Sequence, residues 1–437
     1  MADVRPFRGL RYNLERAGDL SSVITPPYDV ISPAGQLRYC QLSPHNVIRL
    51  DFGLDQPDDS ESNNKYTRAS SYVKQWLDEG ILSQDEQPAF YLVKHRFHLG
   101  DSVLSRFSLV ARMRLEDLET GSVRPHERTM SKPREDRLNL LRACDVNFSP
   151  IMVLFRHKAE GFEALLGDII ERPSPHAVDK DGVEFAMWTV TDEDAIASIS
   201  NLLADKMLYI ADGHHRYETA LNYSRERRAA GPSDGDDAPY NFVMMTITPA
   251  EDPGLIMMPT HRMVKGLAPD ILTSLKGKLA ERFDEELLPP TADAAESLRQ
   301  WNEALEGQAG TSFGLYGLDG DKLCILRAKP GANLKPIDGN SVAGSLDVSI
   351  LHRAILRDML GLDSTAKEDE CLEFTRDGAE AIERVNAGEQ QLAFFLNPTP
   401  ISGMLAVADA RERMPQKSTY FYPKTPTGLV MNPLWDD

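Results

Sequence analysis

Residues 207–217 read Met207-Leu208-Tyr209-Ile210-Ala211-Asp212-Gly213-His214-His215-Arg216-Tyr217. The apolar run from Met207 to Ala211 predicts a buried strand. Gly213 permits the tight turn that follows, because glycine adopts backbone angles closed to other residues. A helix is then predicted from about Arg216 to Arg228. The stretch therefore predicts a strand, a short polar loop and a helix, with the polar residues gathered at the helix start.

The loop 212–216 carries residues suited to phosphate chemistry. A helix start offers unpaired backbone N–H groups and the positive end of the helix dipole, a geometry that binds phosphate. Arg216 adds a permanently charged donor fork, and His214 and His215 exchange protons near neutral pH. Asp212 suits a substrate ammonium group or a Mg²⁺ ion. The alternative is a turn in which the histidines only cap the helix. The loop is not a Walker A motif, because it lacks Gly-Lys-Ser/Thr.

Strand and helix patterns alternate along the rest of the chain and predict an α+β (mixed α/β) fold. Strands are predicted at Asn46–Asp51, Ala89–Val93, Phe107–Ala111, Pro150–Phe155 and Gln391–Leu396. Helices are predicted at Tyr66–Glu79, at Arg134–Ala143 and after a capping pair formed by Thr191 and Asp194. A length of 437 residues favours several domains. We expect an N-terminal α/β domain (1–115), a core (116–250) with an insertion at about 157–205, and a C-terminal α/β domain (251–437) whose last segment returns to the site.

Composition excludes several classes of protein. The 48 Lys and Arg against 67 Asp and Glu give a net charge of −19, so nucleic acid is an unlikely partner. The N-terminus has no signal-peptide pattern, and no apolar run is long enough to span a membrane. The four cysteines lack metal-ligand spacing and are expected to be reduced thiols. These features predict a cytoplasmic protein; the oligomeric state is left open.

Two other clusters are candidates for chemistry. Arg124-Pro125-His126-Glu127-Arg128-Thr129 contains a carboxylate that suits a general base. It matters only if Glu127 approaches the loop 212–216; otherwise it is a solvated charged turn. The run Lys417-Ser418-Thr419 places an ammonium group beside two hydroxyls and suits a carboxylate or phosphate, with a plain edge strand as the alternative.

Several of these stretches resemble a widespread prokaryotic family known as domain of unknown function 1015. The resemblance covers nearly the whole chain and names a family without a function. It rests on Pro6-Phe7-Arg8-Gly9, Pro26-Pro27-Tyr28-Asp29-Val30-Ile31, Asn46-Val47-Ile48-Arg49-Leu50, Ala211 to Tyr217 and Met414 to Lys424.

A part of the chain also resembles the ParB/sulfiredoxin fold, and in particular the free L-serine kinases. The similar parts are His126-Glu127, a helix, the strand at Pro150-Ile151 and the loop 212–216. The resemblance implies that Glu127 activates the substrate hydroxyl, that Asp212 and His215 contact the amino acid, and that Gly213, His214 and Arg216 contact phosphates. It also implies substrate binding by His126 and by Lys417, Ser418 and Thr419.

The resemblance has departures. Thr219 stands where the ParB pattern has alanine, and it is assigned to the nucleotide side of the site. The segment between Ile151 and Met207 is longer than in the compact kinases, which implies an insertion. Sulfiredoxins need a reactive cysteine where this chain has His214, so sulfiredoxin chemistry is excluded.

Three functions follow as hypotheses. The first is a kinase that uses Mg²⁺ with ATP or ADP to phosphorylate a small hydroxyl compound such as free L-serine, with Asp212 as a weak candidate for the Mg²⁺ ligand. The second is a ParB-like nucleotide-binding regulator without a small-molecule acceptor. The third is a metal-dependent hydrolase that uses Asp212, His214, His215 and His126. The first requires that Glu127 and the loop 212–216 face one cavity.

Overall fold

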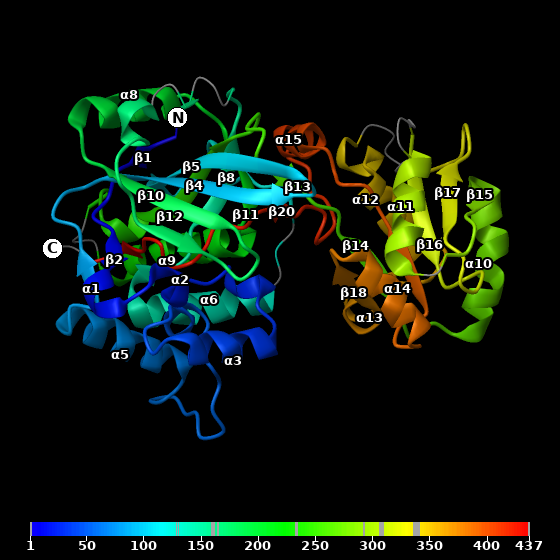
Figure 1. The fold of residues 1–437 in the computed structure, drawn as a ribbon, viewed down its shortest axis with the longest axis horizontal. Coiled ribbons are helices and arrows are strands. Elements are labelled where there is room, and N and C mark those ends of the chain that lie inside the picture. The colour runs from blue at the N-terminus through cyan, green and yellow to red at the C-terminus, as the bar shows by residue number, and fades with distance from the viewer. Residues whose placement is uncertain are drawn as a thin grey trace. The chain divides into compact units, whose positions relative to one another are not determined.

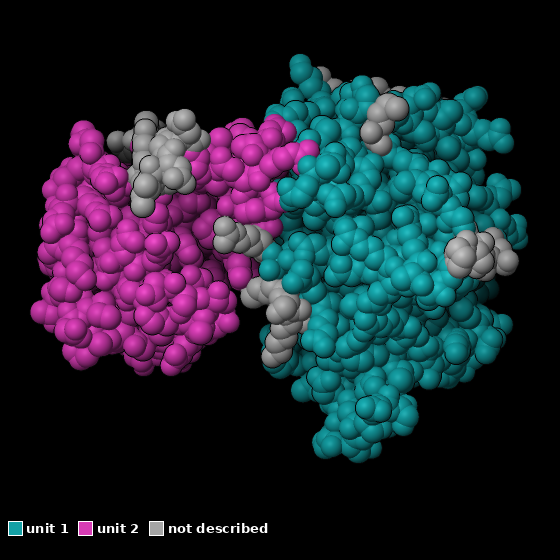
Figure 2. All heavy atoms as spheres, turned by 180° about the vertical axis from the view of Figure 1, so that it is seen from behind, with its two compact units in different colours: residues 1–125, 129–256, 421–437 teal, residues 126–128, 257–420 magenta. Residues whose placement is uncertain are grey.

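The computed structural model describes residues 2–127, 129, 131–158, 162–163, 166–231, 235–291, 293–305, 310–334 and 341–435, apart from the side chains of 131–133 and 168. The chain forms two compact units (Figures 1 and 2). Unit 1 comprises residues 1–125, 129–256 and 421–437, and unit 2 comprises 126–128 and 257–420. The mixed α/β, multi-domain prediction is confirmed. The three predicted domains, with boundaries at 115 and 250, stay a prediction. The two compact units have other boundaries.

Unit 1 is built on a mixed sheet. Its described strands, in spatial order, are β6 (Val123–Arg124), β11 (Leu208–Asp212), β8 (Ile151–Phe155), β12 (Phe242–Pro249), β5 (Ser102–Arg114), β4 (Phe90–Leu99), β10 (Glu184–Val190) and β9 (His176–Val178), with β1 (Val4–Arg5) on β5. The pairs β6–β11 and β8–β12 are parallel, while β8–β11, β5–β12 and β4–β5 are antiparallel. Two small sheets pair β2 (Leu10–Tyr12) with β3 (Leu82–Gln84) and β7 (Val146–Asn147) with β21 (Asn432–Pro433).

Both faces of this sheet are buried, and alternate residues of one strand serve different cores. On β4, Tyr91 and Val93 belong to one core, and Phe90 and Leu92 to the other. The first core includes residues of α5 (Lys65–Asp78) and α6 (Ser131–Cys144). The second includes residues of α8 (Glu193–Leu203) and α9 (His214–Ala230). Figure 1 shows α5 and α6 on one side of the sheet and α8 on the other. The remaining described α-helices of unit 1 are α1 (Leu14–Ala17), α2 (Leu20–Val23), α3 (Pro33–Leu42) and α4 (Ile48–Asp51).

The strand predicted at Asn46–Asp51 is wrong, because this stretch forms the short helix α4 (Ile48–Asp51). Val47, Ile48 and Leu50 are all fully buried, so the residues do not alternate between core and solvent. The Asn46 side chain also accepts a hydrogen bond from the Ile48 N–H at 2.9 Å, which favours a helical start over a strand. The other strands and helices predicted in unit 1 are confirmed. The capping pair predicted for α8 is wrong, because the N-cap residue is Asp192, whose side chain accepts a hydrogen bond from the Ala195 N–H at 2.9 Å.

Unit 2 has an antiparallel sheet of its own. Its described strands, in spatial order, are β15 (Phe283–Leu287), β17 (Cys324–Ala328), β16 (Ser312–Tyr316), β19 (Leu392–Phe395), β14 (His261–Val264) and β18 (Leu372–Thr375). Its described α-helices are α10 (Pro269–Arg282), α11 (Ala294–Leu305), α12 (Asp347–Ile350), α13 (Thr365–Cys371), α14 (Gly378–Asn386) and α15 (Ile401–Asp409). The strand predicted at Gln391–Leu396 is confirmed as β19. No helix among the described residues has the length and apolar character needed to cross a bilayer.

A buried histidine makes the stability of unit 2 dependent on pH. His261 on β14 is 4% exposed, lies 5.1 Å from the Phe395 ring and accepts a hydrogen bond from the Leu396 N–H through Nδ1 at 3.3 Å. Burial, reinforced by the charge of Arg262, lowers the pKa of His261 to about 4. The unfolded chain therefore binds a proton at this residue between pH 6.5 and 4, and the folded chain does not.

Because of His261, we expect the free energy of unfolding of unit 2 to fall by as much as about 3 kcal/mol as the pH falls from 6.5 to 4. The stability that this neutral histidine contributes is complete above pH 6.5. Urea unfolding of the wild type and of His261→Leu at pH 7 and pH 4.5 measures the difference. An equal loss of stability in both proteins contradicts the prediction.

Candidate functional site

The predicted order of strand, glycine turn and helix is confirmed around the loop 212–216, but the helix begins at His214 and not at about Arg216. Strand β11 ends at Asp212, Gly213 adopts a left-handed conformation with φ of 92°, and α9 begins at His214. Gly213 is the N-cap residue and supplies no side chain to the helix start. The helical hydrogen bonds begin with the Tyr217 N–H, which donates to the Gly213 carbonyl at 3.0 Å. The backbone N–H groups of the first turn thus lie at the positive end of a long helix.

Asp212 is held by two cations. Arg216 Nη2 donates to Asp212 Oδ2 at 2.5 Å, and Lys424 Nζ donates to Asp212 Oδ1. The three side chains are only 8–14% exposed. Burial alone would raise the pKa of the Asp212 carboxyl, but the charges of Lys424 and Arg216 outweigh it and hold that pKa well below its usual range. The carboxylate is therefore ionised at neutral pH, and the triad carries a net charge of about +1.

Arg216 also ties the loop to the neighbouring strand. Its Nη1 donates to the Pro150 carbonyl at 2.5 Å and to the Ser149 hydroxyl at 3.1 Å, just before β8 begins. The guanidinium therefore orients Asp212 and joins the ends of β8 and β11. The role that the resemblance implies for Arg216, contact with phosphate, stays a prediction.

A buried arginine of α6 lies behind this loop. Arg137 Nη1 donates to the Asp51 carbonyl at 2.7 Å and to its Oδ1 at 3.1 Å, and its guanidinium lies 4.1 Å from the centre of the Tyr28 ring. Burial raises the pKa of Asp51, although the charges of Arg137 and Arg216 oppose that rise. Tyr28 belongs to Pro26–Ile31, and Asp51 directly follows Asn46–Leu50. Arg137 therefore contacts one quoted stretch through Tyr28 and the residue that directly follows another, Asp51.

A small cavity lies beside α6 and α9. It has a volume of about 40 Å³ and is lined by Asp51, Arg137, Ser149, Arg216, Thr219 and apolar residues of α6, β7 and β8. Water fits this space, but a nucleotide does not. Thr219 is 1% exposed, and its hydroxyl donates to the Arg134 carbonyl at 3.3 Å. Contact of Thr219 with nucleotide stays a prediction.

Asp212 makes a poor ligand for Mg²⁺ in this arrangement, because both of its oxygens accept hydrogen bonds from cations. No group of three or more His, Cys, Asp or Glu side chains suited to a metal ion occurs within the described ranges. Mg²⁺ commonly binds through the phosphates of a nucleotide with few protein ligands. Its binding to Asp212, and the hydrolase set of Asp212, His214, His215 and His126, stay predictions.

Unit 2 brings together the other predicted residues. Glu127 Oε1 accepts hydrogen bonds from the Ser418 N–H at 3.0 Å and from the Thr419 hydroxyl at 3.4 Å. His126 Nε2 lies 2.9 Å from the same Thr419 hydroxyl, and the His126 carbonyl accepts from the Met414 N–H at 2.8 Å. The His126-Glu127 pair and the run 417–419 are far apart in sequence, yet they form one hydrogen-bonded cluster.

A buried arginine supports this cluster. Arg262 on β14 is 4% exposed, and its Nη2 donates to the Lys417 carbonyl at 3.0 Å. Burial lowers the pKa of Arg262 to about 10, with the charge of Glu127 opposing the shift. Arg262 therefore remains charged at neutral pH and holds the backbone of Lys417, whose φ is 55°.

The predicted residues thus form two clusters, one in each unit. Asp212–Arg216 and Thr219 belong to unit 1, whereas His126, Glu127 and 417–419 belong to unit 2. A cavity shared by Glu127 and the loop 212–216 stays a prediction.

Residues 4–349 match the family model described as "Protein of unknown function (DUF1015)". The chain belongs to the DUF1015 family. No curated protein matches the sequence. Among solved structures, a free serine kinase in complex with AMP has 15% identity and a TM-score of 0.34, over 74% of this chain and 92% of that one. A conserved hypothetical protein from Pyrococcus furiosus has 14% identity and a TM-score of 0.36, over 73% and 93%. SbnI with a C-terminal truncation, from Staphylococcus aureus, has 12% identity and a TM-score of 0.33, over 72% and 87%.

Sequence reasoning missed three side chains that hold the clusters of this DUF1015 protein: Lys424, Ser149 and Arg262. Lys424 ends the quoted stretch 414–424, but nothing local marks it as the partner of Asp212. The signal for Ser149 was its place directly before the Pro150 strand. Arg262 directly follows His261, but nothing local marks it as a partner of Lys417.

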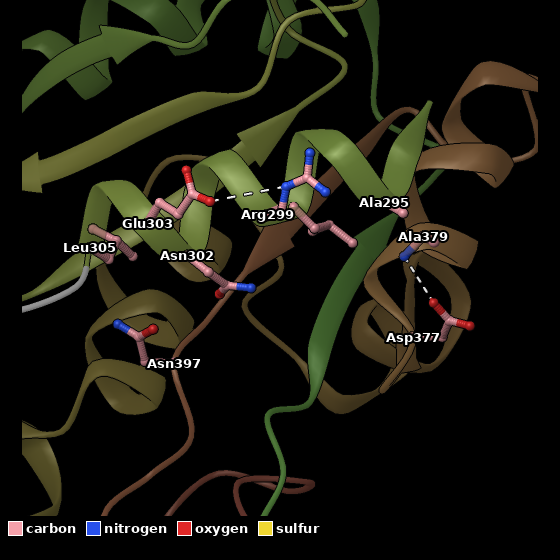
Figure 3. Close-up of a pocket in the computed structure, with 9 residues that line it drawn as sticks. Ala295, Arg299, Asn302, Glu303, Leu305, Asp377, Ala379 and Asn397 are labelled. Atoms are coloured by element: carbon pink, nitrogen blue, oxygen red, sulfur yellow. Dashed lines mark hydrogen bonds and ion pairs between the residues drawn. The ribbon is translucent and has the colours of Figure 1, made fainter. Parts of the chain in front are cut away.

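A groove on unit 2 lies apart from the predicted residues. It has a volume of about 680 Å³ and is lined by parts of α11 and α14 and by Asn397 (Figure 3). Polar groups here engage one another: Arg299 Nε lies 4.0 Å from Glu303 Oε1, and Asp377 accepts from the Ala379 N–H at 2.9 Å. None of the predicted site residues lines this groove.

We expect Gly213→Ala to lower the free energy of unfolding by about 1–2 kcal/mol, because alanine is strained at a positive φ. An added Cβ would also lie 2.9 Å from Arg216 Nε and displace the guanidinium that orients Asp212. Gly231→Ala is the matched control, because Gly231 is the C-cap residue of the same helix, has an extended φ of −177° and has open space around it. Urea unfolding of the two variants tests this; equal stabilities contradict the prediction.

Proposed function

We propose that this protein is a kinase that transfers a phosphoryl group from a nucleotide to the hydroxyl group of a small molecule such as free L-serine. The observation that carries the proposal is the loop 212–216. It places a left-handed glycine, an ionised aspartate and two buried cations at the N-terminus of α9.

The loop suits the nucleotide phosphates. The first-turn N–H groups of α9 donate to anions, and the triad of Asp212, Arg216 and Lys424 has a surplus positive charge. This local charge contrasts with the net charge of −19 of the whole chain. It therefore attracts phosphate to one place on an otherwise acidic protein. His214 and His215 lie in the same turn and are the proposed contacts to phosphate and substrate, respectively.

The cluster around Glu127 suits the acceptor. Phosphoryl transfer needs positioning, charge neutralisation and a proton acceptor, with little covalent chemistry from the protein. In the proposed reaction the substrate oxygen attacks the terminal phosphorus, the bond to the nucleotide's bridging oxygen breaks, and Glu127 accepts the hydroxyl proton. Ser418 and Thr419 fix the carboxylate through the hydrogen bonds described above. The approach of Glu127 to the phosphates is part of the proposal.

Incubation of the full chain with Mg²⁺, ATP or ADP, and a panel of hydroxyl amino acids tests this function. Phosphorus NMR should show a phosphate monoester of the acceptor together with ADP or AMP. Nucleotide binding without acceptor-dependent turnover would favour the ParB-like regulator instead. The absence of both binding and turnover would remove the nucleotide proposal altogether.

A further inference from the structure

A pocket in unit 1 shares no lining residue with the cavity beside the loop 212–216. Its volume is about 220 Å³, enough for a small organic molecule. Three distant parts of the chain form its wall, and Arg112 of β5 and the stretch 237–239 complete it. The wall includes Phe7 and Arg8, Gln84 and Pro88, and Asn432, Pro433 and Trp435. Phe7 and Arg8 belong to the stretch Pro6–Gly9, which was quoted for the family resemblance. The proposed kinase reaction assigns no role to this stretch.

Arg112 belongs to a group of three arginines. The guanidinium carbons of Arg5, Arg112 and Arg114 lie 5.0, 4.7 and 4.6 Å from the centre of the Phe242 ring. The strand register explains this, because Arg5 pairs with Arg112, and Arg114 pairs with Phe242, so all four side chains share one face of the sheet.

Two carboxylates neutralise two of these three arginines. Asp3 accepts from Arg5 Nε and from Arg114 Nε, both at 2.7 Å. Asp237 accepts from Arg5 Nη1 at 3.1 Å and from Arg114 Nη2 at 2.5 Å. No carboxylate among the described residues forms an ion pair with Arg112. The group therefore has one surplus positive charge, and the guanidinium that carries it lines the pocket.

Arg112 is also partly removed from water. Its Nε is buried, and no described residue accepts a hydrogen bond from it. Burial, together with the charge of Arg5, lowers the pKa of Arg112. The charges of Asp237, which also lines the pocket, and of Asp3 oppose that shift, but neither carboxylate forms an ion pair with Arg112. A partly desolvated cation without a paired carboxylate is unfavourable. A bound anion would supply the missing charge.

The structure assigns this pocket to a small organic anion that carries one carboxylate or phosphate group on a flat apolar body. The guanidinium fork of Arg112 matches the oxygens of either group. Arg8 adds a second guanidinium, positioned by its Nε, which donates to the Asp85 carbonyl at 2.8 Å. Phe7, Pro88, Pro433 and Trp435 make part of the lining apolar, which suits the apolar body. Gln84 and Asn432 also line the pocket, although their amide nitrogens already donate to the Arg8 carbonyl at 3.4 Å and to Asn147 Oδ1 at 3.1 Å.

Calorimetric titration of the full chain with phenyl phosphate, benzoate and inorganic phosphate tests the assignment. At least one of the two aromatic anions should bind saturably at millimolar or lower concentration. Tighter binding of phenyl phosphate would identify the phosphate form of the ligand, and tighter binding of benzoate the carboxylate form. Inorganic phosphate should bind more weakly than phenyl phosphate, because it lacks the apolar body. Failure of both aromatic anions to bind overturns the proposal.

Variants locate the binding. Arg112→Gln should weaken it by about tenfold or more, because one charge-assisted pair is lost. Arg96→Gln makes the same charge change at an exposed position of β4, where Arg96 pairs with Glu184 at 2.7 Å, and should bind as the wild type does. Arg112 does not line the cavity beside the loop 212–216, so a loss in Arg112→Gln locates the binding to this pocket. Thermal unfolding confirms that each variant is folded. Unchanged binding by Arg112→Gln, or equal losses in Arg112→Gln and Arg96→Gln, would overturn the proposal.

Discussion

Asp212→Asn is expected to lower the free energy of unfolding of unit 1 by about 3–5 kcal/mol. The change leaves Lys424 and Arg216, whose side chains are 8% and 10% exposed, without the carboxylate that both contact. Two nearly buried cations then lose the carboxylate that lies between them. Urea unfolding, followed by probes in both units, measures the loss, because a chain with two units need not unfold in a single step.

Two controls separate this effect from an ordinary ion-pair loss. Glu226→Gln breaks an exposed pair with Arg142, whose Nη2 lies 2.6 Å from Glu226 Oε1, and should cost less than about 1 kcal/mol. The double variant Asp212→Asn/Lys424→Met removes one cation together with the carboxylate and should recover part of the stability. An Asp212→Asn variant about as stable as Glu226→Gln would show that the triad is not a buried charge cluster.

The pH dependence of the same variant gives a second test. The pKa of Asp212 is depressed in the folded state, so the unfolded chain binds the proton more readily. The stability that the carboxylate contributes is present above about pH 4, the usual pKa of an aspartate, and is lost as the pH falls further. The difference between wild type and Asp212→Asn should therefore shrink below pH 4. A difference that grows on acidification contradicts this sign.

Glu127→Gln is expected to lower kcat of the proposed phosphoryl transfer by about 10²–10⁴-fold, because it removes the proton acceptor. The glutamine oxygen can still accept hydrogen bonds from the Ser418 N–H and the Thr419 hydroxyl, so the local fold should persist. Nucleotide affinity should change little, because the loop 212–216 belongs to the other unit. Turnover and calorimetric nucleotide binding of the same preparation measure the two effects.

The matched control for Glu127 is Glu380→Gln. Glu380 also accepts a hydrogen bond from a threonine hydroxyl in unit 2, that of Thr375 at 2.5 Å, but it lies outside the predicted cluster. It should retain wild-type turnover. Full activity of Glu127→Gln would show that this carboxylate is not the base, and an equal loss in Glu380→Gln would point to a general effect on unit 2.

Local patterns were sufficient where contacts are close in sequence. The strand, left-handed glycine and helix at 208–230 depend on the apolar run, on the conformational freedom of Gly213 and on the helix that follows. The pattern failed at 46–51, where six residues are too few to separate a strand period from a helical turn. There a side-chain cap and complete burial decided in favour of a helix.

The sequence by itself therefore determined the mixed α/β class, the family and the strand, glycine turn and helix around the loop 212–216. Only the tertiary structure decided which residues hold that loop, since Lys424 reaches Asp212 across 212 positions of the chain. It likewise joined Ser418 to Glu127 across 291 positions, and placed Arg112 in a pocket walled by both ends of the chain. These contacts between distant residues depend on burial and charge balance in the folded chain. The pattern of neighbouring residues in the sequence does not predict either of them.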